Sequence, residues 1–164
     1  IHELEDGRIW IGATTTHRQI WESRLIQARA SVLAQACRVV GALQIQSVGT
    51  LGGNVVNAMP AADGSIALMA LSAQAEVASK AGRRWLDLEE LFLRPGVCKV
   101  ESCAEVLTAF RFEGIGERGG SATMPGAICT TRLSPSIVTR TVSSSFGTSR
   151  CRTRKTGETR GRPA

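Results

Sequence analysis

The chain has 164 residues and 43% hydrophobic content, enough for one domain with a buried core. It contains no run of 18 apolar residues, and its acidic start lacks the apolar segment of a secretory signal, so we expect neither a membrane span nor export. Five cysteines, an odd number, argue against a complete disulfide framework and are typical of a reducing cytoplasm.

The formal net charge of +6 is distributed unevenly along the chain. Residues 1–116 contain 11 Lys or Arg and 12 Asp or Glu, whereas residues 117–164 contain 9 and 2. A basic tail can indicate nucleic-acid binding. Here the basic residues are scattered among Ser and Thr, with no aromatic residues alternating for base stacking, so we expect no nucleic-acid partner.

The first predicted elements are a strand and two helices. Residues 8–14 are rich in Ile and Trp and alternate in part, which is typical of a strand. Thr16 can cap a short helix that runs to Trp21. Apolar residues follow at helical spacing between Val32 and Val40, and Gly41 stands just beyond them. This pattern predicts a helix that ends at a glycine.

Residues 42–63 are the most informative part of the chain, and we interpret them as a long functional loop with a brief strand over 54–57. Three glycines in this segment allow tight turns and close approach of a ligand. Consecutive backbone N–H groups in such a loop can form a nest for an anion such as a pyrophosphate. Spacing alone leaves a glycine-rich surface turn equally open, and neither a P-loop nor a Rossmann fingerprint is present.

Several polar side chains accompany these glycines. Thr50 can add a hydroxyl, and Asn54 can brace the turn with its amide. Asp63 lies nine residues beyond Asn54, where its carboxylate could accept hydrogen bonds from sugar-type hydroxyls. Alternatively, Asp63 or Ser65 only caps a helix that runs to about Leu71. The two roles of Asp63 are compatible.

The second half of the domain contains more strand signals than helix signals. Residues 74–80 and 83–87 flank a short turn and predict a hairpin. Residues 87–92 predict a helical turn that ends at 94–96, and residues 106–112 predict a last strand. Alternating strands and helices with hairpins among them favour an α+β or α/β architecture over a helical bundle.

Cysteine and histidine residues form no recognisable metal site. Cys98 and Cys103 are five residues apart, which is not a zinc or iron–sulfur spacing. Cys37 lies in an apolar helical pattern and is expected to be a plain buried thiol. We expect His2 and His17 to be solvated surface residues, and no metal ligand is assigned.

Several short motifs occur in the order and spacing of one protein family. Residues 9–15 are similar to its "IGAxTT" strand, residues 44–54 to its "QIRNxGTxGGN" signature, and residues 60–63 to the "PxxD" that follows. Further matches lie at 36–41, 67–73, 82–84 and 105–108. Taken together, Arg8–Phe112 resembles the FAD-binding domain of the molybdenum hydroxylases, which include bacterial xanthine and carbon monoxide dehydrogenases. Gln46 and Ser47 replace the family's Arg-Asn and so remove a cation from the loop.

The resemblance implies an α+β fold, the larger subdomain of a PCMH-type FAD-binding domain, with a mixed sheet and flanking helices. It implies that FAD contacts Val40, Gly49, Thr50, Leu51, Gly52, Gly53, Asn54, Asp63 and Leu107. The residues at 50 and 52–54 would hold the pyrophosphate, and Asp63 would meet the ribityl or ribose hydroxyls. Val40 and Leu107 would lie near the flavin rings, although both are equally compatible with plain core positions. No catalytic side chain is implied, because the cofactor carries the redox chemistry.

The resemblance also implies partner subunits. A molybdenum subunit oxidises the substrate, and a [2Fe–2S] subunit passes the electrons to FAD, which hands them to NAD⁺ or another acceptor. The family's first flavin loop has no counterpart in this sequence, so we expect part of the FAD site to lie outside it. The alternative is a non-catalytic remnant or subunit-docking fragment that binds no flavin.

The tail has a different character from the rest of the chain. After Ala122 both the family match and the hydrophobic pattern end, and residues 123–164 contain 15 Ser or Thr but seven large apolar residues. Ordering these 42 residues would cost roughly 40–80 kcal/mol, whereas burying the apolar side chains returns about 10–20 kcal/mol. We therefore predict a partial FAD-binding domain at 1–116 and a basic tail at 117–164, either disordered or produced by a frameshift. Translation of the other two reading frames tests the frameshift.

Overall fold

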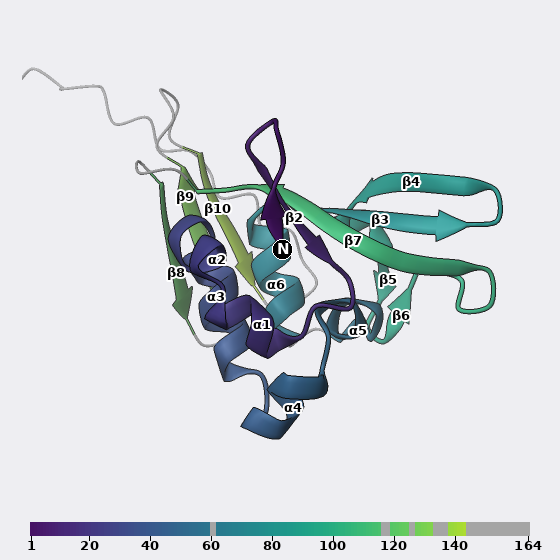
Figure 1. The fold of residues 1–164 in the computed structure, drawn as a ribbon, viewed down its shortest axis with the longest axis horizontal. Coiled ribbons are helices and arrows are strands. Elements are labelled where there is room, and N and C mark those ends of the chain that lie inside the picture. The colour runs from purple at the N-terminus through teal and green to yellow at the C-terminus, as the bar shows by residue number, and fades with distance from the viewer. Residues whose placement is uncertain (60–61, 116–118, 125–126, 133–137, 144–164) are drawn as a thin grey trace, which may run out of the picture.

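The computed structural model describes residues 1–59, 62–115, 119–124, 127–132 and 138–143. Its central feature is a five-stranded sheet (Figure 1). The strand order is β1 (His2–Glu3), β2 (Arg8–Gly12), β7 (Glu105–Glu113), β3 (Gln74–Ser79) and β4 (Gly82–Asp87). All neighbouring pairs in this sheet are antiparallel. The predicted α+β class with flanking helices is confirmed, but the described sheet is antiparallel rather than mixed.

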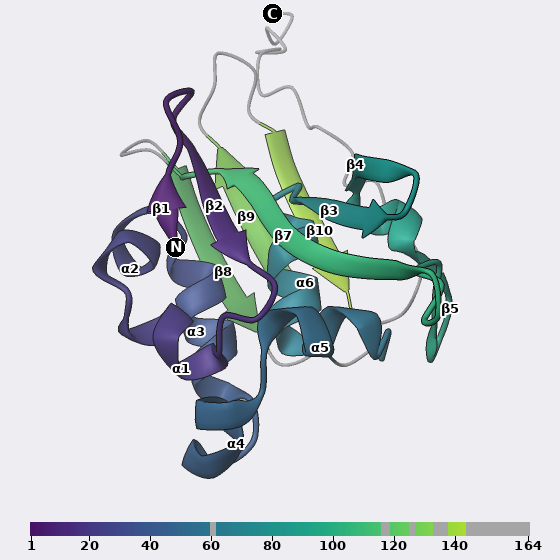
Figure 2. The ribbon, with the colours of Figure 1, turned by 45° about the vertical axis from the view of Figure 1, so that its right-hand side comes forward.

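The helices lie together on one side of the sheet (Figure 2). They are α1 (His17–Glu22), α2 (Arg24–Arg29), α3 (Ser31–Val39), α4 (Leu43–Val48), α5 (Leu51–Val56) and α6 (Asp63–Ala70). The core between sheet and helices contains fully buried side chains from both layers, among them Ile9, Phe110, Leu33 and Leu68. Alternation along β2 and β7 turns one face of each strand toward this core.

Local signals near the start of the chain predicted the structure well. Thr16 caps α1 with a full capping box, in which Gln19 returns its side chain to the Thr16 backbone N–H. The helix α3 ends where expected, and Gly41 follows with a φ of +55°. The hairpin of β3 and β4 is also confirmed, as is the turn after it, which is the 3-10 helix η1 (Leu88–Leu91).

A second, smaller hairpin differs from expectation. Residues 94–96 were predicted to end a helical turn, but they connect β5 (Phe92–Arg94) to β6 (Val97–Cys98). The Gly96 N–H donates to the Ala58 carbonyl oxygen at 2.9 Å. The hairpin is therefore hydrogen-bonded to the connection between α5 and α6, which is distant from it in sequence.

The prediction of a long loop with a brief strand over residues 42–63 is wrong. Most of this segment forms the two short helices α4 and α5. Glycines disfavour helix by about 1 kcal/mol each in isolation. Tertiary contacts override that cost here. Gly52 is buried against the end of β2, where there is no space for a side chain. Short helices are stabilised mainly by such packing and by caps rather than by propensity.

The start of α6 is also different from the prediction. The helix begins at Asp63, and its N-cap is Ala62, which provides no side-chain cap. Neither Asp63 nor Ser65 is therefore the capping residue. Instead the Ser65 N–H donates to the side-chain oxygen of Asn54, 3.1 Å away on α5. A residue from another helix satisfies the donor that local sequence was expected to satisfy.

Three further strands occur in the region predicted to be a tail. They are β8 (Gly119–Met124), β9 (Ala127–Arg132) and β10 (Val138–Ser143), paired antiparallel with β9 in the middle. These strands lie against α3 and α6, contacts that the energy estimate for the tail alone did not include. The other residues of 117–164 lie outside the described residues, so the boundary at 116, the disorder and the frameshift stay predictions.

Candidate functional site

The segment that was predicted to bind FAD is attached to the end of β2. Its residues 49–52 run beside residues 13–17, and Thr16 and Thr50 form an isolated β-bridge. Three backbone hydrogen bonds join the two segments: His17 N to Gly49 O (3.0 Å), Leu51 N to Thr15 O (2.9 Å) and Gly52 N to Ala13 O (2.8 Å). The N–H of Ala13 in turn donates to the Thr108 carbonyl oxygen in β7 at 2.9 Å. The start of α5 is thereby fixed to the central sheet.

Two of the three glycines are required by the packing of the chain itself. A Cβ on Gly49 would lie 2.8 Å from the carbonyl oxygen of Ile45, and one on Gly52 would lie 2.8 Å from that of Ala13. Both distances are shorter than any normal contact. Gly53 is different, because it is exposed and its Cβ would meet only the Thr50 hydroxyl oxygen, at 3.1 Å. Gly53 is therefore where an external group can approach the backbone.

The predicted nest of free amides is not present at residues 51–54. The N–H groups of Leu51 and Gly52 donate to residues 15 and 13. The N–H of Gly53 donates to the Thr50 hydroxyl oxygen at 3.1 Å, and that of Asn54 to the Thr50 carbonyl oxygen at 3.0 Å. A nest needs unpaired amides. These four are already paired, so they cannot cradle a phosphate in this arrangement.

Thr50 itself keeps two donors. In an antiparallel bridge of this type the N–H of the bridging residue points away from its partner. The Thr50 N–H makes no hydrogen bond to any residue that the structure describes, and its hydroxyl, while accepting from Gly53, finds no described acceptor for its own proton. Thr50 is half-buried and adjoins the open surface at Gly53. This pair of donors suits an anionic oxygen.

Asn54 has a structural role within the chain. Its side-chain oxygen accepts from the Ser65 N–H at 3.1 Å and lies 3.3 Å from the Ser65 hydroxyl oxygen. A Cβ on Gly64 would lie only 2.9 Å from the same oxygen. The predicted bracing by this amide is found, but it joins α5 to α6 rather than stabilising the turn of its own segment.

Asp63 begins α6 next to this link. The residue is exposed overall, yet partial burial of the carboxyl group raises its pKa. Burial raises the pKa of the Cys37 thiol to about 12, with a smaller contribution from the nearby Asp63 charge. The prediction of a buried Cys37 is confirmed. Val40 follows Cys37 by one helical turn at the end of α3 and is half-buried.

Leu107 lies on a different element from the other predicted site residues. It is in β7 opposite Val77 of β3, belongs to the hydrophobic core and is only 9% exposed. The structure thus joins α5 to α6 through the hydrogen bond from Ser65 to Asn54. The helix α3, which Val40 caps, packs beside α6, the helix that Asp63 begins. A shared ligand for Val40 and Leu107 stays a prediction.

His17 was expected to be solvated, and this expectation is wrong. The residue is 2% exposed, and its imidazole Cδ2 would be 3.3 Å from a Cβ on Gly49. Its Nδ1 has no hydrogen-bond partner in the described part of the chain, and burial lowers the pKa of the ring. Residues 13–17 were also missed as a support for the site, although the "IGAxTT" match pointed to them. His2, by contrast, is exposed as expected and stacks on Trp10 at 4.9 Å.

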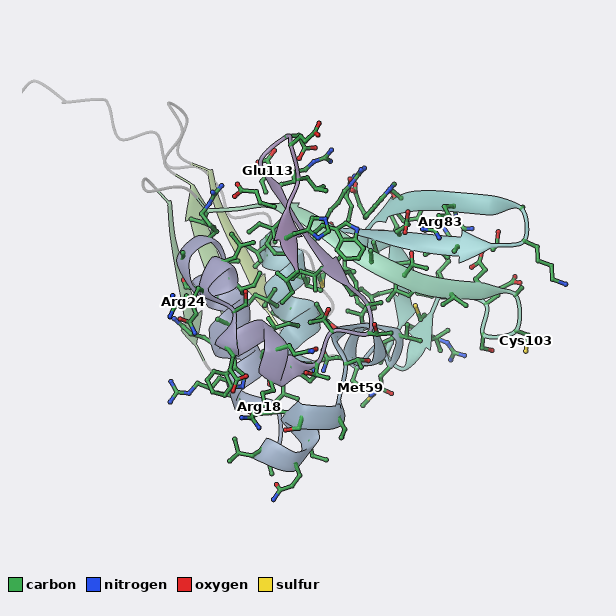
Figure 3. The ribbon with its side chains drawn as sticks, viewed as in Figure 1. Arg18, Arg24, Met59, Arg83, Cys103 and Glu113 are labelled. Atoms are coloured by element: carbon green, nitrogen blue, oxygen red, sulfur yellow. The ribbon has the colours of Figure 1, made fainter. Side chains whose placement is uncertain are left out.

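Several apolar side chains surround the site without being buried. On α4 these are Leu43, Ile45 and Val48, of which Val48 is 74% exposed. Met59, after α5, is also exposed and lies at the same end of the molecule (Figure 3). Within the described residues no three His, Cys, Asp or Glu side chains group as a metal site. No helix among them has the length and apolar character needed to cross a bilayer.

Residues 1–112 match the family model described as the FAD binding domain in molybdopterin dehydrogenase. The xanthine dehydrogenase FAD-binding subunit of Escherichia coli O157:H7 is 32% identical over 108 residues, covering 66% of this chain and 37% of the relative. The carbon monoxide dehydrogenase medium chain of Hydrogenophaga pseudoflava is 27% identical over 118 residues, covering 72% of this chain and 41% of the relative. The chain thus spans less than half the length of these relatives.

Solved structures show the same fold. Carbon monoxide dehydrogenase from Hydrogenophaga pseudoflava matches with a TM-score of 0.75 and 23% identity, over 85% of this chain and 53% of that one. Quinoline 2-oxidoreductase from Pseudomonas putida 86 matches with a TM-score of 0.69 and 21% identity, over 82% and 51%. Because residues 1–115 are about 70% of the chain, the likeness extends beyond residue 115. With the family model covering residues 1–112, the chain belongs to the FAD-binding domain family of the molybdopterin dehydrogenases, whose cofactor is FAD, as predicted.

Proposed function

We propose that this chain is the FAD-binding part of a molybdenum-containing dehydrogenase and passes electrons from [2Fe–2S] clusters through FAD to NAD⁺ or another acceptor. Its partners would be a molybdenum-cofactor subunit and a [2Fe–2S] subunit. Family membership and relatives named as FAD-binding subunits support this function. Bound FAD would supply the electron-transfer chemistry, and the protein would supply position and electrostatics.

The proposal is carried by the two donors of Thr50, which have no partner among the residues that the structure describes. An N–H and an O–H on one residue, next to a glycine without a covering side chain, can bind one oxygen of a diphosphate. Hydrogen bonds to a charged group contribute about 1.5–3 kcal/mol each. Asp63, exposed at the start of α6, can accept from ribityl or ribose hydroxyls. The exposed apolar side chains of α4 offer a surface for the flavin ring system.

An FAD titration of the full chain tests the proposal, with quenching of flavin fluorescence as the signal. Thr50→Val removes the hydroxyl donor and should weaken binding about tenfold, whereas Thr50→Ser keeps it and should bind like wild type. Gly53→Val places a side chain on the open surface and should abolish flavin binding. Circular dichroism of each variant confirms that the fold is retained. Equal affinities for Thr50→Val and Thr50→Ser would exclude the hydroxyl from the site.

The alternative is a fragment that binds no flavin and only docks to other subunits. The occupied amides of residues 51–54 favour it, because they remove the expected phosphate nest. The same titration separates the two functions. A wild-type chain that shows no quenching at saturating FAD supports the docking fragment and contradicts the flavin site.

A further inference from the structure

Gln46 is the buried residue of α4, with 4% of its surface exposed. Its side-chain Nε2 donates to the Arg38 carbonyl oxygen at 2.8 Å, and its backbone N–H donates to Ala42 O at 3.0 Å. Arg38 lies in the last turn of α3, where carbonyl groups have no donor inside the helix. A side chain from α4 therefore completes the end of α3.

This link spans two parts of the proposed flavin surface. Val40 follows Arg38 by two residues, and Gly49 follows Gln46 by three. Between them the chain reverses at Gly41, whose φ is +55° and whose Cβ would lie 3.2 Å from the Ile45 side chain. The position of α4 relative to α3 therefore depends on this tight turn and on the hydrogen bond from Gln46.

Besides this hydrogen bond, α4 is held by its packing against α1 and by the backbone bond from His17 to Gly49. The apolar side chains of α4 are exposed, so no apolar face anchors the helix. It lies against α1. Among the residues that the structure describes, His17 Nδ1, Trp21 Nε1 and Gln46 Oε1 have no hydrogen-bond partner. A helix that buries a single polar side chain depends on that side chain for its orientation.

We infer that Gln46 is a positioning residue for FAD, which sets the separation between Val40 and Thr50 by tying α4 to the end of α3. The inference rests on the proposed function. Gln46 acts through its Nε2–H donor, because a bond to the Arg38 carbonyl oxygen needs a donor and no charge.

Hydrogen exchange of the full chain without flavin gives the first test. Gln46→Met keeps the side-chain length but removes the donor, and it should speed exchange of the amides in 46–54 about tenfold. Amides of α6 should be unchanged. Gln44→Met, at an exposed position of the same helix, is the matched control and should leave both regions unchanged. Uniform acceleration in both helices would indicate general destabilisation and overturn the positioning role.

FAD affinity gives the second test. Gln46→Met should weaken FAD binding about tenfold, and Gln46→Arg should restore it, because the guanidinium can donate to the same carbonyl. Wild-type affinity in Gln46→Met overturns the positioning role alone. A wild-type chain that binds no FAD overturns the proposed function and this role together, so the two failures are distinguishable.

Discussion

The helices α4 and α6 are both short and rich in apolar residues, yet they are held in opposite ways. In α6 the residues from Gly64 to Leu68 are all buried, and its apolar side chains belong to the core. In α4 the buried residue is polar, and the apolar side chains are exposed. The apolar residues of α6 therefore belong to the core, whereas those of α4 lie on the surface. Contiguous exposed apolar side chains commonly mark a binding surface.

The sharpest way to test this contrast is to truncate one leucine in each helix. Leu68→Ala in α6 removes a side chain that is 0% exposed and should lower the free energy of unfolding by about 2–5 kcal/mol. Leu43→Ala in α4 removes one that is 69% exposed and should change it by less than about 0.5 kcal/mol. Urea unfolding followed by circular dichroism measures both. Similar losses in the two variants would mean that α4 is covered by the rest of the chain.

The two neighbouring glycines of α5 provide a smaller but more local test. Gly52→Ala places a Cβ 2.8 Å from the Ala13 carbonyl oxygen and should cost about 1–3 kcal/mol of unfolding free energy. Gly53→Ala adds its Cβ on the exposed side, where the gain in helix propensity of up to about 1 kcal/mol offsets the contact with Thr50. In urea unfolding, Gly53→Ala should have a higher free energy of unfolding than Gly52→Ala. The reverse ranking would contradict the close packing of Gly52 in α5 against Ala13 at the end of β2.

These glycines also show what the sequence could reveal and what it could not. The cap at Thr16 and the helix end at Gly41 depend on neighbouring residues, and both were predicted. The helix α5 was missed, because the cost of its two glycines is compensated by contacts with Ala13 and Thr15, more than 30 residues away. Contacts between residues so far apart in sequence leave no recognisable pattern in the residues of the helix itself. The helix α4 has no glycine and was missed as well, because it was read as part of the same loop.

The order of motifs placed residues 49–54 and Asp63 in one FAD site, and that site stays a prediction. The structure joins α5 to α6 through Asn54 and Ser65. The sequence could not show that the four amides after Thr50 are already paired, since their partners lie partly on another segment. Nor could it show that Gln46 is buried, because polar residues on a short helix are usually solvated.

The smallest expected effect concerns His17, which joins α1 to Gly49. Burial lowers the pKa of its imidazole from the ordinary value of 6.5. Below pH 6.5 the unfolded chain therefore takes up a proton at this residue that the folded chain does not. Stability rises with pH wherever the unfolded state binds more protons, so it should fall as the pH decreases below 6.5.

Urea midpoints of wild type at a series of pH values from neutral to mildly acidic measure this decrease. His17→Gln cannot take up the proton and should flatten the pH profile, whereas the exposed His2→Gln should leave it unchanged. Protonation of His17 would weaken its packing against Gly49, which follows α4, and would leave the packing of α6 in the core unchanged. The pH effect should therefore act on α4 and not on α6. A profile that His17→Gln does not alter would show that the ring is hydrated in the folded chain.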